Sequence, residues 1–405
     1  MKYLNTKEKL RLKTLLDKNK LHTIKNTKGK IIKYTYDDFD FVLWPYEEQT
    51  KIKHKVLREY LFVWATKLGS VNYINYYDGF SGGGAYYNSE ENDINYGSPI
   101  IAKEQFIRAK RGNKSSFYFN DKNKSNVENL KKAFVKSGIS TSNITYTIGE
   151  FENNITSFIE QLKDNPRPTF FMIDPFGINA HFSTIKKIME IPKTEVLFNF
   201  MYNFARRFTN NKNSETNLTD LFGTEEWLNY KNLSGDAKEN ALRDLYKQQL
   251  KSCAKYVYQY RMCFPNDKRT YYYLFHASNN RDGCSIMKDS FAKINYGEVE
   301  FLGPNQPNPA QLAIWDLTTD KIETLKVQIW NEFKGQTILY KDIVDRYIDS
   351  TTYLERHIKQ AVLLLKDEYA EFIHVNSKTR TIDYDDTICF FDKPNLKPVQ
   401  MSLFS

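Results

Sequence analysis

The sequence predicts an α/β fold: a mostly parallel, Rossmann-like sheet with an antiparallel hairpin at one edge, followed by a small C-terminal domain. Strand-like and helix-like segments alternate from about residue 73 to residue 202, which indicates parallel strands joined by helices. Acids stand at or just after the ends of four of these strands, where the ligands of such sheets bind. Three prolines between residues 304 and 309 indicate a linker before the second domain.

The elements of the first domain follow from hydrophobic periodicity. Apolar residues recur about every 3.6 positions between residues 50 and 68, which predicts a helix that packs on the sheet. The alternation that follows predicts strands at 73–78, 115–121, 144–149, 169–174 and 195–202, and helices near 98–111, 125–137, 153–163 and 183–190. We expect a helical insertion at about 209–268, including 239–260. A strand at 271–276 should then return through a turn at 279–283 and close one edge of the sheet as a hairpin.

These elements place the domain boundaries. We expect a basic N-terminal arm at 1–43, the sheet domain at 44–302, a linker at 303–318, a second domain at 319–395 and a tail at 396–405. The second domain should contain helices at 321–333, 340–348 and 353–367 and strands at 371–376 and 387–391. Three helices followed by a hairpin predict a winged helix-turn-helix.

Composition limits the function classes. The 405 residues are 41% hydrophobic and 26% charged, as in ordinary soluble domains, and they include no apolar run of about 18 residues that would predict a membrane-spanning helix. The four cysteines lack C-x-x-C spacing and the six histidines are isolated. Neither a disulfide framework nor a metal site is therefore predicted, and a cytoplasmic location without membrane contact is expected.

The net charge of +9 is concentrated at the N-terminus. Residues 1–33 hold eleven Lys and Arg against two acids, whereas the other 372 residues hold 47 of each sign. A polyanion would therefore be attracted mainly to the N-terminal arm. A solvated, lysine-rich leader explains the same charges equally well, and both interpretations stay open.

A glycine-rich loop follows the first predicted strand. Asp78 ends the strand, and Phe80, Gly82 and Gly84 follow it in a D-x-F-x-G-x-G pattern. Glycines accept positive φ angles and let a ligand approach the backbone, and the pattern is typical of the S-adenosylmethionine (SAM) pocket of class I methyltransferases. The loop also contains a G-x-S-x-G pattern, the nucleophile elbow of hydrolases. A polar stretch follows it instead of a helix, so a hydrolase is the minor alternative.

Residues after the next two strands fit the same pocket. Asp121 ends the second strand, where nucleotide-binding sheets place an acid that accepts hydrogen bonds from ribose hydroxyls. Glu150 and Phe151 follow the third strand. We expect Glu150 to accept a hydrogen bond from the adenine amino group and Phe151 to lie against the adenine ring. The structural alternatives are an exposed turn aspartate and an acid at a helix N-terminus.

The fourth strand ends in Asp174, Pro175, Phe176 and Gly177. An exocyclic base amine that accepts a methyl group needs hydrogen-bond acceptors that orient it, an aromatic wall and exclusion of water. Asp174 and the Pro175 carbonyl would supply the acceptors, and Phe176 would supply the wall. The same four residues also suit a simple turn.

Four basic residues are candidates for contacts with nucleic acid. Arg206 and Arg207 follow the fifth strand, and Arg356 and Lys359 lie outside the apolar stripe of the third helix of the second domain. Residues 321–393 hold eleven basic and thirteen acidic side chains, which is poor electrostatics for binding a polyanion. A role of the second domain in binding a protein or positioning a substrate is therefore at least as well supported.

Five motifs occur in a fixed order: residues 51–55 (Lys-Ile-Lys-His-Lys), 77–82 (Tyr-Asp-Gly-Phe-Ser-Gly), 97–99 (Gly-Ser-Pro), 173–177 (Ile-Asp-Pro-Phe-Gly) and 221–223 (Leu-Phe-Gly). In this order the chain, from about Trp44 onward, resembles the three-Cys-motif partner (TcmP) family. The resemblance implies a class I methyltransferase with a C-terminal winged helix and a neighbouring three-Cys-motif partner protein. The first loop departs from the family, because Ser-Gly-Gly-Gly stands where the family usually has Ala-Gly-Pro-Gly.

The Asp-Pro-Phe-Gly segment carries two further resemblances. It is similar to the motif of tRNA guanine-N2-dimethyltransferases and, more distantly, to the D-P-P-Y motif of amino-methylating DNA enzymes. Both resemblances imply methylation at an exocyclic nitrogen. The prediction is a SAM-dependent methyltransferase that acts on a nucleobase amine in RNA or DNA. The alternative is a methyltransferase-like binding module of a mobile-element or antiviral system that acts with a partner protein.

Overall fold

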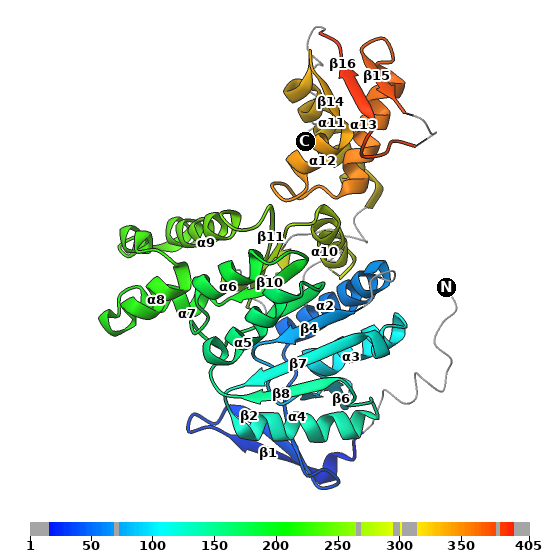
Figure 1. Cartoon of the computed structure of the whole chain (residues 1–405). Coiled ribbons are helices and arrows are strands. Elements are labelled where there is room, and N and C mark those ends of the chain that lie inside the picture. The colour runs from blue at the N-terminus through cyan, green and yellow to red at the C-terminus, as the bar shows by residue number, and fades with distance from the viewer. Residues whose placement is uncertain are drawn as a thin grey trace. The chain divides into compact units, whose positions relative to one another are not determined.

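The computed structural model describes residues 16–68, 73–264, 269–294, 300–301, 314–377 and 381–392 (Figure 1). The chain divides into two compact units, each of which is described by itself. The first comprises residues 1–295 and 299–305, and the second comprises residues 296–298 and 306–405. Within the described residues, no helix is both long and apolar enough to cross a membrane.

The first unit is built on an eight-stranded sheet with the order β13-β11-β12-β10-β9-β4-β7-β8. The strands are β4 Ile74–Asp78, β7 Ser115–Asp121, β8 Ile144–Ile148, β9 Thr169–Ile173, β10 Thr194–Phe200, β11 Tyr256–Cys263, β12 Thr270–Ser278 and β13 Glu300–Phe301. The five strands β4, β7, β8, β9 and β10 run parallel, and β12 is antiparallel to both β10 and β11. The predicted Rossmann-like α/β sheet is therefore confirmed.

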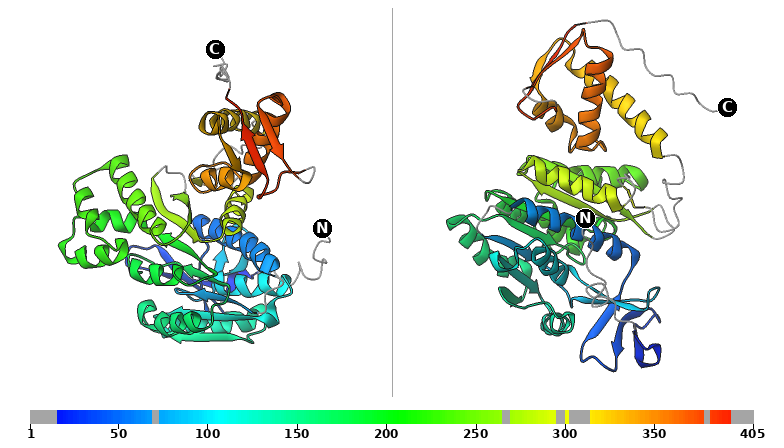
Figure 2. Two further views of the ribbon diagram at one scale, coloured as in Figure 1. Left: turned by 45° about the horizontal axis from the view of Figure 1, so that its top comes forward. Right: turned by 90° about the vertical axis from the view of Figure 1, so that its right-hand side faces the viewer.

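Buried strands and amphipathic helices explain why this sheet forms. Every residue of β4, β9 and β10 is buried, as expected for parallel strands that are covered on both faces (Figure 2). The helices are α2 Glu48–Lys67, α3 Ser98–Arg108, α4 Lys124–Ser137, α5 Phe151–Asp164, α6 Phe182–Met189, α7 Tyr202–Phe208, α8 Glu215–Phe222, α9 Gly235–Lys251 and α10 Arg281–Ile294. Because the central strands are parallel, their carboxyl ends meet at one edge of the sheet.

The chain between residues 239 and 283 differs from the prediction. The expected helix over 239–260 is wrong, because α9 ends at Lys251 and β11 follows; the hairpin consists of β11 and β12. Within β11, buried Tyr258 and Tyr260 alternate with the less buried Gln259. This alternation directly follows a long helix-like segment, so the whole stretch was predicted as helix. The strand that was expected to return after a turn at 279–283 is also wrong, because helix α10 begins at Arg281 instead. The side chain of Asn280 accepts a hydrogen bond from the Asp282 N–H at 2.9 Å as α10 begins.

Much of residues 21–43, predicted as part of the N-terminal arm, forms strands instead. β1 Leu21–Lys25, β2 Ile31–Tyr36 and β3 Val42–Pro45 join β5 Ala85–Asn88 and β6 Asp93–Tyr96 in a sheet of order β1-β2-β3-β5-β6. Trp44 of β3 pairs with Tyr86 of β5, which ties this sheet to the loop after β4. Residues 22–30 are exposed on both faces, so they lack the alternation that marks a half-buried strand. The first fifteen residues of the predicted arm lie outside the described residues.

The second unit contains three helices and a three-stranded antiparallel sheet of order β14-β16-β15. Its elements are α11 Ile314–Phe333, β14 Thr337–Leu339, α12 Tyr340–Tyr347, α13 Glu355–Glu368, β15 Ile373–Asn376 and β16 Thr387–Phe390. The predicted helices and strands lie in these elements, but β14 was not predicted and α11 begins within the expected linker, just beyond its last proline. Most of that linker and the predicted tail lie outside the described residues. On α13, Arg356 is exposed and Lys359 is partly buried.

Candidate active site

The carboxyl ends of the parallel strands border a cavity of about 720 Å³. This volume lies within the range of about 300–1,000 Å³ that is usual for small-molecule sites. The predicted site residues that line the cavity are Phe80, Gly82, Asp121, Glu150, Phe151, Asp174, Pro175 and Phe176. Asp78, Gly84, Gly177, Arg206 and Arg207 are not part of its lining. Gly82 and Asp174, which follow different strands, therefore share one cavity.

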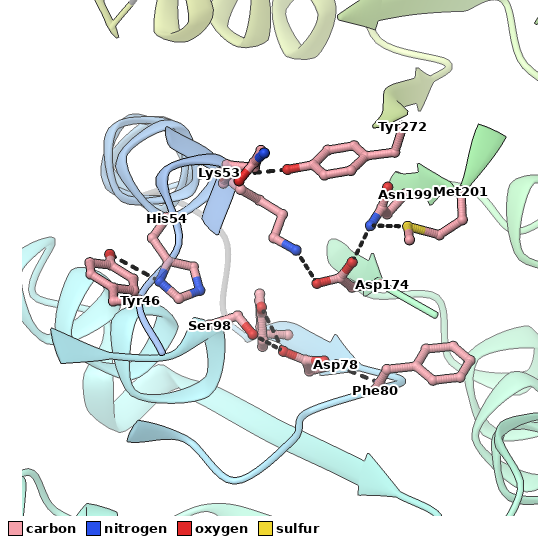
Figure 3. A network of polar contacts seen from close by, with 12 residues as sticks. Tyr46, Lys53, His54, Asp78, Phe80, Ser98, Asp174, Asn199, Met201 and Tyr272 are labelled. Carbon is pink, nitrogen blue, oxygen red and sulfur yellow. Dashed lines mark hydrogen bonds and ion pairs between the residues drawn. The ribbon is translucent and has the colours of Figure 1, made fainter. Parts of the chain in front are cut away.

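Asp78 lies beneath the glycine loop. It is fully buried, and its carboxylate accepts hydrogen bonds from the Phe80 N–H (3.2 Å), the Ser98 hydroxyl (2.6 Å) and the Tyr76 hydroxyl (3.3 Å) (Figure 3). Burial raises the pKa of Asp78 to about 7, and the charge of Asp174 acts in the same direction, whereas the three hydrogen bonds lower the pKa. Asp78 thus holds the glycine loop from its buried side, through the Phe80 N–H, and its pKa lies near neutral pH.

Trp44, which packs against Gly83, forms part of one wall of the cavity. A β-carbon at Gly83 would lie 2.1 Å from ring atoms of Trp44, so a larger residue does not fit without movement of that ring. The neighbouring Gly82 has a φ angle of +60°, which glycine adopts at little cost. Trp44 also lines the cavity, and the ammonium group of Lys33 lies 5.1 Å from its ring centre.

The rest of the glycine loop has a structural role. The Ser81 side chain is buried, and its hydroxyl donates a hydrogen bond to the Asn120 carbonyl at 3.0 Å. The loop leads into strand β5 rather than a helix, so it is not the nucleophile elbow of a hydrolase. Gly84 packs against Leu130 of α4, where a β-carbon would lie 2.3 Å from the leucine Cδ1.

Asp121 fixes the glycine loop and keeps capacity to accept another hydrogen bond. Its Oδ2 accepts the Gly82 N–H at 3.0 Å. Its Oδ1 accepts the Asn123 N–H at 2.8 Å and the Asn126 amide at 3.0 Å. A carboxylate offers about four lone-pair sites, so about one remains on a residue that lines the cavity.

Asn120 joins three strand-end loops. Its Nδ2 donates to the carbonyls of Gly79 (3.1 Å) and Gly149 (3.2 Å). Its Oδ1 accepts the Thr147 hydroxyl at 2.9 Å and the Asn154 amide at 2.7 Å. The amide is thereby fully hydrogen-bonded. Asn120 was not predicted as a site residue, although an amide beside the final acid of an aromatic-rich strand is a signal that the sequence contains.

Glu150 and Phe151 open helix α5 beside the glycine loop. Glu150 is the N-cap residue, and its exposed carboxylate pairs with Lys122 at 3.1 Å. Phe151 is buried, and its ring centre lies 5.2 Å from that of Phe80. The two aromatic rings form an apolar wall of the cavity, and Glu150 provides an acceptor at its rim.

Asp174 is the centre of a polar network at the other end of the cavity (Figure 3). Lys53 of α2 donates to its Oδ2, and the Asn199 Nδ2 at the end of β10 donates to its Oδ1 at 2.5 Å. The side chains of Lys53 and Asp174 are only 9% and 25% exposed, so water screens this ion pair little. The Asn199 Oδ1 is buried and has no hydrogen-bond partner among the described residues. An unused acceptor therefore lies next to the Asp174 carboxylate.

Phe176 lies at the solvent-exposed side of the cavity. Its side chain is 78% exposed, and its ring meets that of Phe204 edge to face with the centres 5.3 Å apart. The guanidinium of Arg207 lies 4.7 Å from the Phe204 ring centre. Arg206 and Arg207 are exposed on α7, and the chain of contacts through Phe204 places Arg207 beside the cavity.

Helix α2 and strand β12 close the cavity near Asp174. The Tyr272 hydroxyl donates to the Gln49 carbonyl at 3.1 Å, and the Lys53 ammonium lies 5.8 Å from the Tyr272 ring centre. The next residue, His54, contacts the Tyr46 hydroxyl at 3.2 Å. Burial lowers the pKa of His54 well below its usual value, and the charge of Lys53 lowers it further, so His54 is neutral. In the sequence, Lys53 stands out only as part of a family motif, with no role predicted for it.

Metal ligands and disulfides are not features of the described residues. No group of three or more His, Cys, Asp or Glu side chains in the described ranges is arranged to hold a metal ion. No disulfide joins the four cysteines, all of which the structure describes.

No protein-family model and no curated protein matches the chain. Several solved structures are similar to it at low identity. Human methyltransferase-like protein 13 in complex with SAH is 12% identical, with a TM-score of 0.33 over 60% of this chain and 92% of that chain. An O-methyltransferase from Bacillus cereus in complex with SAH is 12% identical, with a TM-score of 0.31 over 56% and 80%. A SAM-dependent methyltransferase from Agrobacterium tumefaciens is 8% identical, with a TM-score of 0.36 over 66% and 77%. Likeness at this level carries no argument about activity, which we therefore argue from the cavity.

Proposed function

We propose that the protein is a SAM-dependent methyltransferase that modifies an exocyclic amino group of a nucleobase in RNA or DNA. One observation carries the proposal: the glycine loop with Asp121 and the segment from Asp174 to Phe176 line the same cavity. Neither half alone is specific, because glycine loops also bind phosphates and Asp-Pro-Phe-Gly also forms turns. Transfer between two bound molecules requires a donor site and an acceptor site in one space.

The end of the cavity with the glycine loop fits SAM. The backbone at Gly82 is open to a ligand, and Asp121 has a lone-pair site for a ribose hydroxyl. Phe80 and Phe151 offer an apolar surface for adenine, with the Glu150 carboxylate at its rim. When it is bound, SAM supplies an electrophilic methyl group. The chain itself holds the two reactants together and limits access of water.

The end with Asp174 fits a base amine. The amine loses one proton when its nitrogen bonds to the methyl carbon, so acceptors that hold its N–H groups favour the reactive orientation. Asp174 is one such acceptor, and the Pro175 carbonyl is a second candidate. Lys53 holds the Asp174 carboxylate in place. The exposed ring of Phe176 is available to stack on a base that has left its strand.

Each half of the proposal has its own test. Calorimetry measures SAM binding to the wild type and to Asp121→Ala, which should bind at least about tenfold more weakly because a charge-assisted hydrogen bond is lost. Asp164→Ala removes an exposed carboxylate of α5 outside the cavity and should bind like the wild type. Absence of binding heat with the wild type would defeat the donor half.

Transfer of a labelled methyl group from SAM to pooled RNA or DNA tests the acceptor half. Asp174→Ala should abolish transfer while it still binds SAM, and Asp164→Ala should transfer normally. Mass spectrometry of the nucleosides then identifies the base and distinguishes RNA from DNA. Undiminished transfer by Asp174→Ala would contradict the role of Asp174 and favour a binding module.

The partners belong to the same proposal. We propose that Arg206 and Arg207 meet phosphates of the nucleic acid; Arg207 contacts Phe204, which in turn contacts Phe176. For the second unit we propose a winged helix in which Arg356 and Lys359 of α13 contact either nucleic acid or a protein. The resemblance to the TcmP family supports a three-Cys-motif protein as that partner, and the net acidic charge of residues 321–393 also favours a protein. Unchanged nucleic-acid affinity of Arg356→Gln/Lys359→Gln would assign the unit to the protein partner.

A further inference from the structure

Strand β1 and the tip of the β1–β2 hairpin stand in solvent, whereas β2 is partly buried. All side chains from residue 22 to residue 30 are exposed, and Ile24 and Ile32 are each 40% exposed. The hairpin is held at one side by the pairing of β2 with β3, and Figure 2 shows its blue strands projecting from the first unit. A two-stranded hairpin is marginally stable by itself in water. The side chains of residues 22–30 add little to the core, so they are available for another role.

The tip of this hairpin has a defined conformation. The Asn26 Oδ1 accepts the N–H groups of Lys28 and Lys30, both at 3.0 Å. The Gly29 N–H donates to the Asn26 carbonyl at 2.9 Å, and Gly29 has a φ angle of +76°. These hydrogen bonds fix the backbone of the tip, from which the lysine side chains extend.

The hairpin is basic and contains no counter-charge of its own. Residues 21–36 include no Asp or Glu and four lysines, which are Lys25, Lys28, Lys30 and Lys33. Lys30 pairs with Glu47 at 3.2 Å, in an exposed ion pair. Lys25 and Lys28 form no ion pair with any residue that the structure describes. Exposed lysines without acidic partners favour a polyanionic ligand.

The tip end of strand β2 borders the candidate active site. Ile32 and Lys33 of β2 line the same cavity as Asp174. The Lys33 ammonium lies over Trp44, and Trp44 covers Gly83 of the glycine loop. A strand of nucleic acid that contacts the hairpin lysines is therefore brought to the cavity.

We infer that the β1–β2 hairpin binds the sugar-phosphate backbone of the substrate strand whose base enters the adjacent cavity; this inference rests on the proposed function. Lysines bind phosphates as point charges, so the hairpin contributes affinity and position rather than sequence readout. Ile24 and Ile32 offer apolar contacts to sugars or unstacked bases. Lysines on an edge strand also prevent pairing between molecules. If that were their only role, removing them would leave nucleic-acid binding unchanged.

The test removes the two lysines that lack acidic partners. Lys25→Gln/Lys28→Gln changes exposed side chains only, and Lys114→Gln/Lys187→Gln removes two exposed lysines elsewhere in the first unit as a matched control. Fluorescence anisotropy of the full chain measures binding of a fluorescein-labelled single-stranded RNA and of DNA of the same sequence across a salt series. The hairpin variant should bind about tenfold more weakly, and the slope of log K against log salt should become shallower by about 1.4, because two phosphate contacts are lost. The control pair should match the wild type.

Calorimetry of SAM on the same proteins separates this inference from the proposed function. Unchanged SAM affinity together with weaker oligonucleotide binding supports the inference, and the charge reversal Lys25→Glu/Lys28→Glu should weaken binding further. Equal salt slopes for the hairpin variant and the wild type would overturn the inference that the hairpin binds the substrate strand. A wild type that binds neither RNA nor DNA would also overturn it. Loss of binding to an acidic protein with unchanged oligonucleotide affinity would assign the hairpin to a protein partner instead. A wild type that binds oligonucleotides through the hairpin but not SAM would overturn the proposed function alone.

Discussion

The two ends of the candidate active site are built in different ways. At the end with the glycine loop, Asn120 joins three loops and Asp121 accepts three N–H groups, so nearly every polar group is already paired. At the other end, the Asp174 carboxylate is held by one ammonium and one amide, and Phe176 is 78% exposed. The first end is fixed by hydrogen bonds and close packing, whereas the second is held by an ion pair and is open to solvent.

This difference fits two kinds of ligand. A pre-formed site binds a small molecule with little loss of conformational entropy, which suits a cofactor that is the same in every turnover. A base that arrives on a polymer and leaves its strand needs an open entrance and acceptors that can adjust to it. The comparison predicts that changes at the fixed end alter stability and cofactor binding, and that changes at the open end alter transfer.

The largest effect is expected beneath the fixed end, at Asp78. Its pKa is raised from 3.8 to about 7, so between these pH values the folded protein keeps a proton that the unfolded chain has lost. The free energy of unfolding therefore falls as the pH rises through this window, by up to about 4 kcal/mol, and is level above it. Asp78→Asn keeps the shape without the charge and should remove this fall in urea denaturation. Parallel pH profiles for the wild type and Asp78→Asn would show that burial of the carboxylate has no such cost.

The next effect is expected at the open end. Asp174→Asn keeps the size of the side chain but replaces one acceptor oxygen with an amide donor. Methyl transfer should fall at least about 100-fold, equivalent to about 2.7 kcal/mol in the barrier, while SAM affinity changes less than about threefold. Single-turnover transfer and calorimetry measure the two quantities. An equal loss in both would mean that the two ends do not have separate roles.

A smaller effect is expected for the ion pair itself. Lys53→Met keeps the length of the side chain and leaves the Asp174 carboxylate without its cation. The free energy of unfolding should fall by about 1–2 kcal/mol, less than for a fully buried pair because Asp174 is 25% exposed. Lys53→Met/Asp174→Asn should recover most of this loss in a double-mutant cycle. Additive losses would mean that the pair is not coupled.

The smallest effect is expected at Gly83. The β-carbon of Gly83→Ala would lie 2.1 Å from the Trp44 ring, so the ring must move away from the glycine loop. SAM affinity should fall about fivefold, or about 1 kcal/mol, with methyl transfer at saturating SAM nearly unchanged. Calorimetry of Gly83→Ala/Trp44→Leu provides the control, because leucine is smaller than tryptophan and removes the clash with the alanine β-carbon. A Gly83→Ala variant that binds SAM normally but transfers the methyl group poorly would assign this wall to the acceptor end of the cavity instead of the SAM end.

The sequence predicted the residues of the cavity that strand ends position. Asp121 and Asp174 were found because hydrophobic periodicity locates the ends of strands, and parallel strands bring those ends together. Lys53 and Trp44 come from α2 and β3, which reach the cavity only through tertiary packing. No local pattern indicates such a contact. Asp78 was predicted at the end of the first strand, where β4 does end, but as a cofactor-binding residue. It is buried outside the cavity lining and is hydrogen-bonded to Ser98 and Tyr76, which sequence spacing does not reveal.

The same distinction holds for the fold. β4 and β9 are buried along their whole length, and the nearly continuous apolar run of β9 makes its sequence diagnostic. β1 is largely exposed and β2 is only partly buried, so their sequences look like a charged arm. β11 follows α9 after only a few residues, and the helical signal before it concealed its alternation. Prediction failed where burial, rather than local pattern, determines the element.

A crystal structure of the protein with S-adenosylhomocysteine tests the central claim most directly, because the claim is that one cavity holds both reactants. The account predicts one ligand molecule in the cavity, in contact with Gly82 and Asp121, with free space left beside Asp174. An empty cavity at saturating ligand, or ligand bound at another place on the chain, would contradict it.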